Sequence, residues 1–285
     1  MQVISSKDNE LIKNIRKLKE KKYRDLENSY IIEGIKLVKE AINEGVNIKQ
    51  IIMCEDFTDN EIDKDTLYEI AKHNLVYVTK NLFDTITDVK TPQGIIAIIE
   101  KRIGIRSVTN KENGSMIDLS NSMNVEKLNK IDYSQDIIIA LDGVQDPGNL
   151  GTIIRTADSA NLNQIVISKD SADPYNPKVV RSTMGAIFRV NVIEAEDLKE
   201  ELKKAQENKF KIMITALDAK KSIYKADFNK KVIVIGNEAN GVSKEVQAMA
   251  DEKVIIPMLG KTESLNASVA ASIMIYEYVR RKIGE

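Results

Sequence analysis

The sequence has few of the residues that build metal centres, disulfides or membrane spans. Its 285 residues include one cysteine, Cys54, one histidine, His73, and no tryptophan. One cysteine cannot form an internal disulfide or a thiolate zinc site, so we expect no metal centre. The uncharged stretch 264–276 is shorter than the ~20 apolar residues that a membrane span needs, and the first residues carry charge where a secretory signal has its apolar core. We therefore expect a cytoplasmic protein without a membrane partner.

Charge is unevenly distributed along the chain, although the formal net charge is only −1. Residues 1–24 contain eight basic and three acidic side chains. Apolar residues at positions 11, 12, 15 and 18 recur between them at helical spacing, which predicts an amphipathic basic helix over residues 7–22. Such a helix either contacts phosphate groups or is a solvated face, and charge alone favours the solvated face.

Alternating strand and helix patterns predict two α/β domains, residues 1–101 and residues 136–285. Residues 102–135, rich in Asn and Ser, are interpreted as a linker or insertion with a short helix near 125–130. In the first domain we expect strands at 30–32, 48–54, 76–78 and 95–99, and helices at 35–42, 59–73 and 80–86. In the second we expect strands at 137–141, 164–168, 189–193, 211–217, 231–235 and 253–256, and helices at 152–160, 178–186, 198–207, 243–250 and 265–282. The continuous apolar run at 137–141 favours a doubly wound parallel sheet, with ligands at the carboxyl ends of its strands.

Three loops at predicted strand ends carry polar residues of interest. The first, 142–151, has three glycines, but their spacing is not G-x-G-x-x-G, and Asn149 stands where a Walker loop needs lysine. The second, 236–243, holds Glu238 between glycines. The third leads through Ser264 into a helix that we expect Ser264 to cap. A further cluster, 174–186, brings Arg181 onto a helix. The failed glycine spacing argues against a dinucleotide-dependent enzyme, which the α/β alternation alone would suggest.

The segments 146–157, 236–241 and 256–268 resemble, in order, the three motifs of the SpoU (TrmH-like) RNA 2'-O-ribose methyltransferases. Residues 4–34 and 91–95 are similar to the small N-terminal RNA-binding domain common in this family. The resemblance implies a C-terminal parallel-sheet α/β domain with a trefoil knot whose loops hold S-adenosylmethionine. The residues that match the cofactor-binding positions are Leu217, Gly236, Asn237, Gly241, Ile256, Pro257, Met258 and Leu265.

The implied reaction is methyl transfer from S-adenosylmethionine to a ribose 2'-hydroxyl, which a site must orient and help to deprotonate. The residues that match the catalytic positions are Arg155, Asn149, Glu238, Ser264 and Asn266. Because a guanidinium is a poor base, Arg155 acts either as a base in a perturbed environment or as an electrostatic stabiliser. We expect RNA contacts from Lys17, Lys21, Arg24 and Arg181.

The resemblance also implies a homodimer, and Val269, Ile273 and Tyr276 give the last helix an apolar face that suits one. We expect ribosomal RNA as the substrate, by analogy with the N-terminal domain of the ribosomal-RNA branch of the family. The alternatives are a tRNA 2'-O-methyltransferase and a non-catalytic RNA-binding protein of the same fold.

Overall fold

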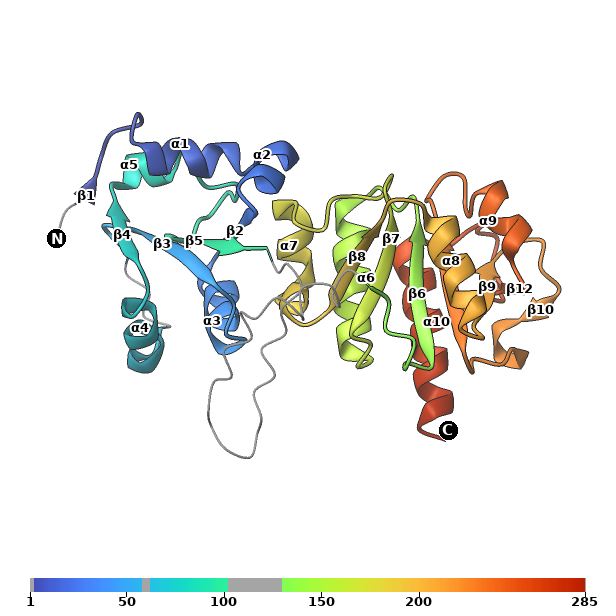
Figure 1. Ribbon diagram of the computed structural model, residues 1–285. Coiled ribbons are helices and arrows are strands. Elements are labelled where there is room, and N and C mark those ends of the chain that lie inside the picture. The colour runs from blue at the N-terminus through green and yellow to red at the C-terminus, as the bar shows by residue number, and fades with distance from the viewer. Residues whose placement is uncertain (1–2, 58–61, 102–129, 285) are drawn as a thin grey trace. The chain divides into compact units, whose positions relative to one another are not determined.

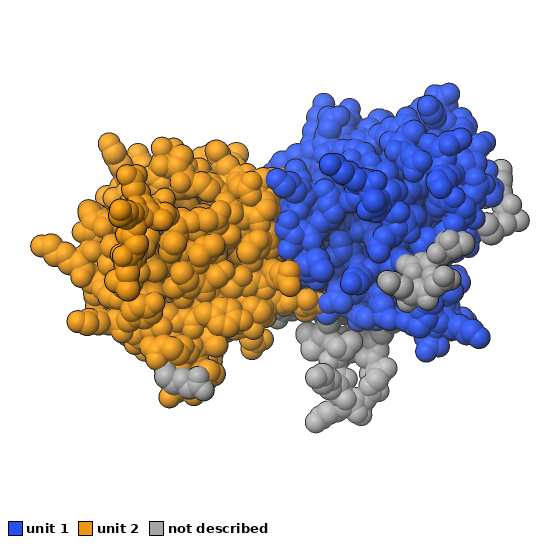
Figure 2. All heavy atoms as spheres, turned by 180° about the vertical axis from the view of Figure 1, so that it is seen from behind, with its two compact units in different colours: residues 1–119, 175–188 blue, residues 120–174, 189–285 orange. Residues whose placement is uncertain are grey.

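The computed structural model describes residues 3–57, 62–101 and 130–284. The chain divides into two compact units, residues 1–119 with 175–188 and residues 120–174 with 189–285 (Figure 2). The predicted domains differ from this division in one segment, since residues 175–188 pack with the first unit although the chain belongs to the second unit on either side of them. The predicted short helix near 125–130 lies largely outside the described residues.

Within the described residues, the first unit is built on a mixed five-stranded sheet in the order β1-β4-β3-β5-β2 (Figure 1). Its strands are β1 (Val3–Ile4), β2 (Ser29–Glu33), β3 (Ile48–Cys54), β4 (Leu75–Val78) and β5 (Ile95–Glu100). Its helices are α1 (Glu10–Lys17), α2 (Lys21–Leu26), α3 (Ile35–Asn43), α4 (Lys64–Ala71), α5 (Lys80–Phe83), α7 (Pro177–Thr183) and the 3-10 turn η2 (Ala186–Phe188). Buried side chains of α1 and α5 pack on one face of this sheet, which explains the helical spacing of the apolar residues in the basic segment.

The basic segment forms two helices where the sequence predicts one. α1 ends at Lys17, and Lys19 and Glu20 make tight backbone bonds to Arg16 and Lys17 before α2 begins. Leu18 at this corner is fully buried, so the chain turns there to keep it in the core. The sequence gives no proline or glycine to mark the break, which explains why the pattern reads as one helix.

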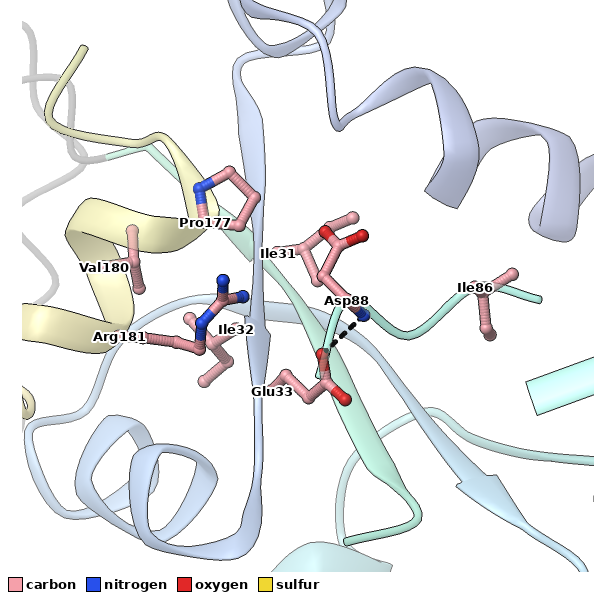
Figure 3. Close-up of a pocket in the computed structure, with 8 residues that line it drawn as sticks. All are labelled: Ile31, Ile32, Glu33, Ile86, Asp88, Pro177, Val180 and Arg181. Carbon is pink, nitrogen blue, oxygen red and sulfur yellow. Dashed lines mark hydrogen bonds between the residues drawn. The ribbon is translucent and has the colours of Figure 1, made fainter. Parts of the chain in front are cut away.

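Helix α7 packs against strand β2 of the same unit. Val180 and Arg181 of α7 line a small pocket with Ile31 and Ile32 of β2 (Figure 3). The helix ends because Met184 and Gly185 both adopt positive φ angles, +51° and +94°, which is earlier than the sequence predicts. The apolar face of α7 therefore explains why this segment belongs to the first unit.

Within the described residues, the second unit is a parallel seven-stranded sheet in the order β10-β12-β9-β11-β6-β7-β8 (Figure 1). Its strands are β6 (Ile137–Asp142), β7 (Gln164–Ser168), β8 (Asn191–Ala195), β9 (Lys211–Thr215), β10 (Lys221–Ser222), β11 (Lys231–Gly236) and β12 (Glu252–Ile255). Its helices are α6 (Pro147–Ser159), α8 (Leu198–Glu207), α9 (Lys244–Met249), α10 (Ala267–Lys282) and the 3-10 turn η3 (Ile223–Lys225).

Helices cover both faces of this sheet, so the predicted doubly wound architecture is confirmed. α8 and α9 pack on one face, whereas α6 and α10 pack together and α10 also contacts β11. The short strands β1 and β10 were not predicted, because two residues are too few to show a periodic pattern. The trefoil knot that the resemblance implies stays a prediction. No helix among the described residues is long and apolar enough to cross a membrane.

Candidate active site

A cavity of about 640 Å³ lies at the carboxyl ends of three neighbouring strands of the second unit, β9, β11 and β12. This is the edge of a parallel sheet where ligands bind in open α/β folds, and the volume is typical of a small-molecule site. We call it the cofactor cavity. It is lined by residues 215–218, 235–242, 254–256, 263–265 and by Gln247, Met258, Ala267 and Ala270.

The loop after β11 forms one wall and is held by its own backbone. The N–H of Asn237 donates to the carbonyl of Gly241 and the N–H of Gly241 donates back, both at 2.9 Å. A Cβ at Gly236 would lie 2.1 Å from the carbonyl carbon of Gly241, so only glycine allows this close approach. Gly241 has a φ of +68°, which also favours glycine. The two glycines therefore shape the cavity wall.

The side chain of Asn237 stabilises the same loop. Its Nδ2 donates to the carbonyl of Gly143 at 2.7 Å, and its Oδ1 accepts from the N–H groups of Ala239 and Asn240. Asn237 thus joins the loop after β11 to the loop after β6, with its side-chain donor and acceptor both engaged within the protein.

Seven of the eight residues predicted to bind the cofactor line the cavity, and Pro257 does not. Leu217 contributes an apolar side chain that is 63% exposed, as expected for a surface that a ligand covers. Ser264 also lines the cavity but does not cap the last helix. Asn266 is the cap: its Oδ1 accepts from the N–H groups of Ser268 and Val269, so α10 begins two residues later than predicted.

Three predicted catalytic residues form one hydrogen-bonded group, the amide network Glu238, Asn149 and Asn266. Asn149 is buried near the start of α6, where its Nδ2 donates to Glu238 Oε1 at 2.9 Å. Its Oδ1 accepts from Asn266 Nδ2, also at 2.9 Å. The network therefore joins the loop after β11 to the first turns of α6 and α10, which lie far apart in the sequence.

Glu238 also accepts bonds from the backbone N–H groups of Gln145 and Asp146, at 3.3 and 3.2 Å. Partial burial would raise the pKa of this carboxyl group, but the bonds from Asn149 and from the backbone outweigh it and hold the pKa below its ordinary value. Glu238 is therefore an anion at neutral pH, and its bonds hold the chain at the beginning of α6.

Arg155 lies on α6 and is exposed. Its guanidinium makes no hydrogen bond or ion pair with any described residue, and it is not among the residues that line the cofactor cavity. Since α6 also carries Asn149, the helix links Arg155 to the amide network. The arginine is left available for a ligand outside the chain.

The residues predicted to contact RNA lie in the first unit, and one of the four, Arg24, needs correction. Lys17 and Lys21 are exposed. Arg24 is only 2% exposed, and its guanidinium donates to the carbonyls of Leu18 and Lys19 at 2.9 and 2.6 Å. It satisfies helix-end carbonyls and is not a phosphate contact. The charge pattern of the segment could not reveal that Arg24 is buried, because its burial follows from the turn of the chain at Leu18.

Arg181 was predicted on a helix of the second domain, and the structure places that helix, α7, in the first unit. It shares its pocket with two carboxylates, those of Glu33 and Asp88 (Figure 3). Glu33 is held there by hydrogen bonds from Thr87 Oγ1 and from the Asp88 N–H. Asp88 also forms an ion pair with Lys19, and the RNA contact of Arg181 stays a prediction.

Comparisons with known proteins agree with the arrangement of the two units along the chain. Residues 136–276 match the SpoU rRNA Methylase family, and residues 9–97 match the MRM3-like substrate binding domain. The chain is 30% identical to the 23S rRNA (guanosine(2553)-2'-O)-methyltransferase RlmP of Bacillus subtilis over 97% of its own length and 98% of that protein. This chain belongs to the SpoU methylase family.

Two further relatives extend this result. The SpoU chain is 36% identical to the 23S rRNA (guanosine-2'-O-)-methyltransferase RlmB of Xanthomonas axonopodis over 52% of its own length and 60% of that protein. It superimposes with a TM-score of 0.80 on the AdoMet-bound rRNA methyltransferase of Sinorhizobium meliloti, at 28% identity and covering 100% and 99% of the two chains. The predicted family and α/β fold are thus confirmed, and the chain is an S-adenosylmethionine-dependent RNA methyltransferase.

Proposed function

We propose that this SpoU methyltransferase methylates a ribose 2'-hydroxyl of ribosomal RNA. The observation that carries the proposal is the amide network, whose Glu238 also lines a cavity formed by residues that match the family's cofactor positions. Ribosomal RNA is favoured over tRNA because relatives named as 23S rRNA methyltransferases match the chain, one of them along nearly its full length. A substrate of this kind also supports the expected cytoplasmic location, where ribosomal RNA is modified.

The cofactor cavity has the chemistry that S-adenosylmethionine needs. Its wall combines apolar side chains, among them Leu217, Met258 and Leu265, with backbone of the loop after β11. Its lining includes the acidic residues Asp218, Glu238 and Glu263, which suit a ligand with a positively charged sulfonium. When bound there, S-adenosylmethionine supplies an electrophilic methyl group.

The chain's own residues then act on the ribose. Glu238 is a weak base because hydrogen bonds lower its pKa, so we assign it to positioning Asn149 and the first turn of α6. Asn149 and Asn266 hold the loops that surround the hydroxyl, and Ser264 is free to donate to it from the cavity wall. We assign Arg155 to the substrate phosphate and to the alkoxide that forms as the hydroxyl loses its proton, because a guanidinium stays charged at physiological pH.

The expected test is Arg155→Ala. The change removes no hydrogen bond or ion pair within the described residues, so folding and S-adenosylmethionine affinity stay close to those of the wild type. Methyl transfer to ribosomal RNA falls by more than about tenfold, which is about 1.4 kcal/mol in the barrier.

The assay measures transfer of labelled methyl groups to ribosomal RNA and to tRNA in parallel, and maps the product by its resistance to alkaline cleavage. Arg155→Lys keeps the positive charge but loses the fork of paired N–H donors of the guanidinium. Its rate therefore shows how much of the effect of Arg155 comes from charge and how much from hydrogen-bond geometry. Retention of more than a tenth of the wild-type rate by Arg155→Ala would remove the residue from the reaction. Efficient methylation of tRNA alone would establish the alternative substrate.

We also infer that the enzyme is a homodimer through α6 and α10. Val269 and Tyr276 of α10 are 46% and 49% exposed, and with Thr152, Ser268, Ser272 and Ile273 they line an open hollow of about 360 Å³. Arg155 lies one turn beyond Thr152 on α6, so a second copy on this surface would approach the arginine. Ile273→Glu should halve the mass measured by sedimentation, whereas Leu67→Glu, at an exposed leucine of α4, should not. A monomeric wild type at micromolar concentration would contradict the proposal.

A further inference from the structure

A half-buried tyrosine, Tyr23, lies between two lysines where α1 turns into α2. The ammonium groups of Lys17 and Lys22 each lie 5.8 Å from the ring centroid of Tyr23. The side chain is partly exposed, and its hydroxyl has no hydrogen-bond partner among the described residues. Leu26, one turn further along α2, is 72% exposed and extends the apolar surface. We call Lys17, Lys22, Tyr23 and Leu26 the corner patch.

Within the described part of the chain, the two lysines of the corner patch form no ion pair, whereas Lys13 and Lys19 nearby do. On α1, Lys13 pairs with Glu10, and beyond its end Lys19 pairs with Asp88. Lys17 and Lys22 form no ion pair or hydrogen bond with any described residue; both contact the tyrosine ring, and the charge of Lys17 also helps to lower the pKa of Glu10. The nearby carboxylate of Asp25 is paired with Lys101, which further reduces the negative charge around the patch.

Arg24 fixes the corner on which the patch is built. Its buried guanidinium donates to the carbonyls of Leu18 and Lys19, the residues between the two helices. Bonds from a charged donor to these carbonyls hold α2 at a set angle to α1. The positions of Lys17, on one helix, and of Tyr23, on the other, are therefore defined before any ligand binds.

We propose that the corner patch binds an unpaired nucleotide of the RNA substrate, with the base stacked on Tyr23 and the adjoining phosphates held by Lys17 and Lys22. The inference rests on the proposed function in taking RNA as the substrate. The two ammonium groups lie over the ring on flexible side chains, which can move to its edge when a base stacks. Such a site suits single strands, because every base has a face to stack and every linkage carries a charge. A double helix buries its bases and offers only phosphates, so the patch favours a loop or bulge over a duplex.

The absence of tryptophan from the chain allows a direct test. Tyr23→Trp introduces a single tryptophan whose fluorescence a stacked base quenches. We expect a single-stranded RNA of about eight nucleotides to quench it, and the same sequence in a duplex to quench it far less. The matched control is Tyr68→Trp, at a tyrosine that is 65% exposed and contacts Lys72 but lies on α4 beside Asp65 and Glu69. Equal quenching of both variants, or of Tyr23→Trp by both RNAs, would overturn the proposal.

Affinity measurements separate the ring from the lysines. Tyr23→Ala should weaken binding of the single strand between about fivefold and about 150-fold, with little change in its dependence on salt, whereas Tyr23→Phe should bind like the wild type. Lys17→Ala and Lys22→Ala should each reduce the log-log salt slope by about 0.7. An unchanged affinity of Tyr23→Ala, with its thermal midpoint preserved, would overturn the stacking.

The two proposals fail independently. If the wild type methylates ribosomal RNA while Tyr23→Trp is not quenched, the corner patch is refuted and the proposed function stands. If Tyr23→Trp is quenched while no RNA is methylated, the proposed reaction is refuted and the binding site stands.

Discussion

Replacing Asn149 by aspartate changes a single group of the amide network. The Oδ1 acceptor that Asn266 uses stays in place, while the Nδ2 donor that faces Glu238 at 2.9 Å becomes a second carboxylate oxygen. The variant therefore loses a hydrogen bond to a charged acceptor and gains a like-charge contact, at a buried position whose size is unchanged.

The magnitude follows from the hydrogen bond. A bond to a charged group contributes about 1.5–3 kcal/mol, and the exposure of Glu238 reduces this, so we expect a loss of about 1–2 kcal/mol in unfolding free energy near neutral pH. For a unit of this size, the thermal midpoint of the second unit should fall by roughly 2–8 °C.

The contribution of this contact to the unfolding free energy should depend on pH with the opposite sign in the variant. In the wild type the pKa of Glu238 lies below its ordinary value of 4.5, so its contribution is present above that pH and is lost as the pH falls. In Asn149→Asp two adjacent carboxyl groups raise the pKa of one of them, and the folded state binds a proton that the unfolded state does not. The deficit should therefore shrink as the pH falls from about 7.5 to about 5.5.

The matched control is the double variant Asn149→Asp with Glu238→Gln. The new glutamine amide can donate to the new carboxylate at position 149, which restores one hydrogen bond with its direction exchanged. Urea unfolding of the wild type, the two single variants and the double variant gives the coupling between the positions. A variant Asn149→Asp as stable as the wild type near neutral pH, or a deficit that does not shrink on acidification, would refute the role assigned to this contact.

Two other changes test the structure elsewhere. Gly236→Ala should abolish S-adenosylmethionine binding measured by calorimetry and destabilise the second unit, because its Cβ would meet backbone at 2.1 Å. The control is Gly260→Ala, whose Cβ meets nothing within 4 Å. Equal behaviour of the two variants would contradict the close approach at Gly236. Cys54 is buried, and burial raises the pKa of its thiol to about 11, so a thiol reagent at mildly alkaline pH should label the native protein slowly and the urea-unfolded protein fast. Rapid labelling of the native protein would show that this strand is open to solvent.

Much of the fold follows from local pattern. The buried strand at Ile137–Asp142 and its parallel neighbours follow from continuous apolar runs, and the three polar loops follow them in the sequence. The site residues could be named from motifs, but the bonds between Asn149 and its two partners, 89 and 117 residues away, depend on the assembled sheet. A local sequence pattern carries no information on contacts between residues so far apart in the chain.

The errors have a common physical cause. Arg24 looks like the other basic residues around it, and its burial depends on carbonyls that are available only because the chain turns at Leu18. Asn266 replaces Ser264 as the cap because the helix begins later, and both residue types are suitable caps. In each case the sequence allows two equivalent interpretations, and tertiary contacts decide between them.

The packing of α7 on β2 affects the order in which the protein can be completed during synthesis. Strand β2 is made early, yet the helix that covers part of it comes much later in the chain, after the first strands of the second unit. Ile31 and Ile32 therefore stay without Val180 while those strands are translated. The cofactor cavity is completed later still, because Ala267 and Ala270 come from the last helix. The emerging chain thus carries a first unit without its α7 while β6 and β7 are made, and it acquires the full wall of the cofactor cavity only after α10 has been made.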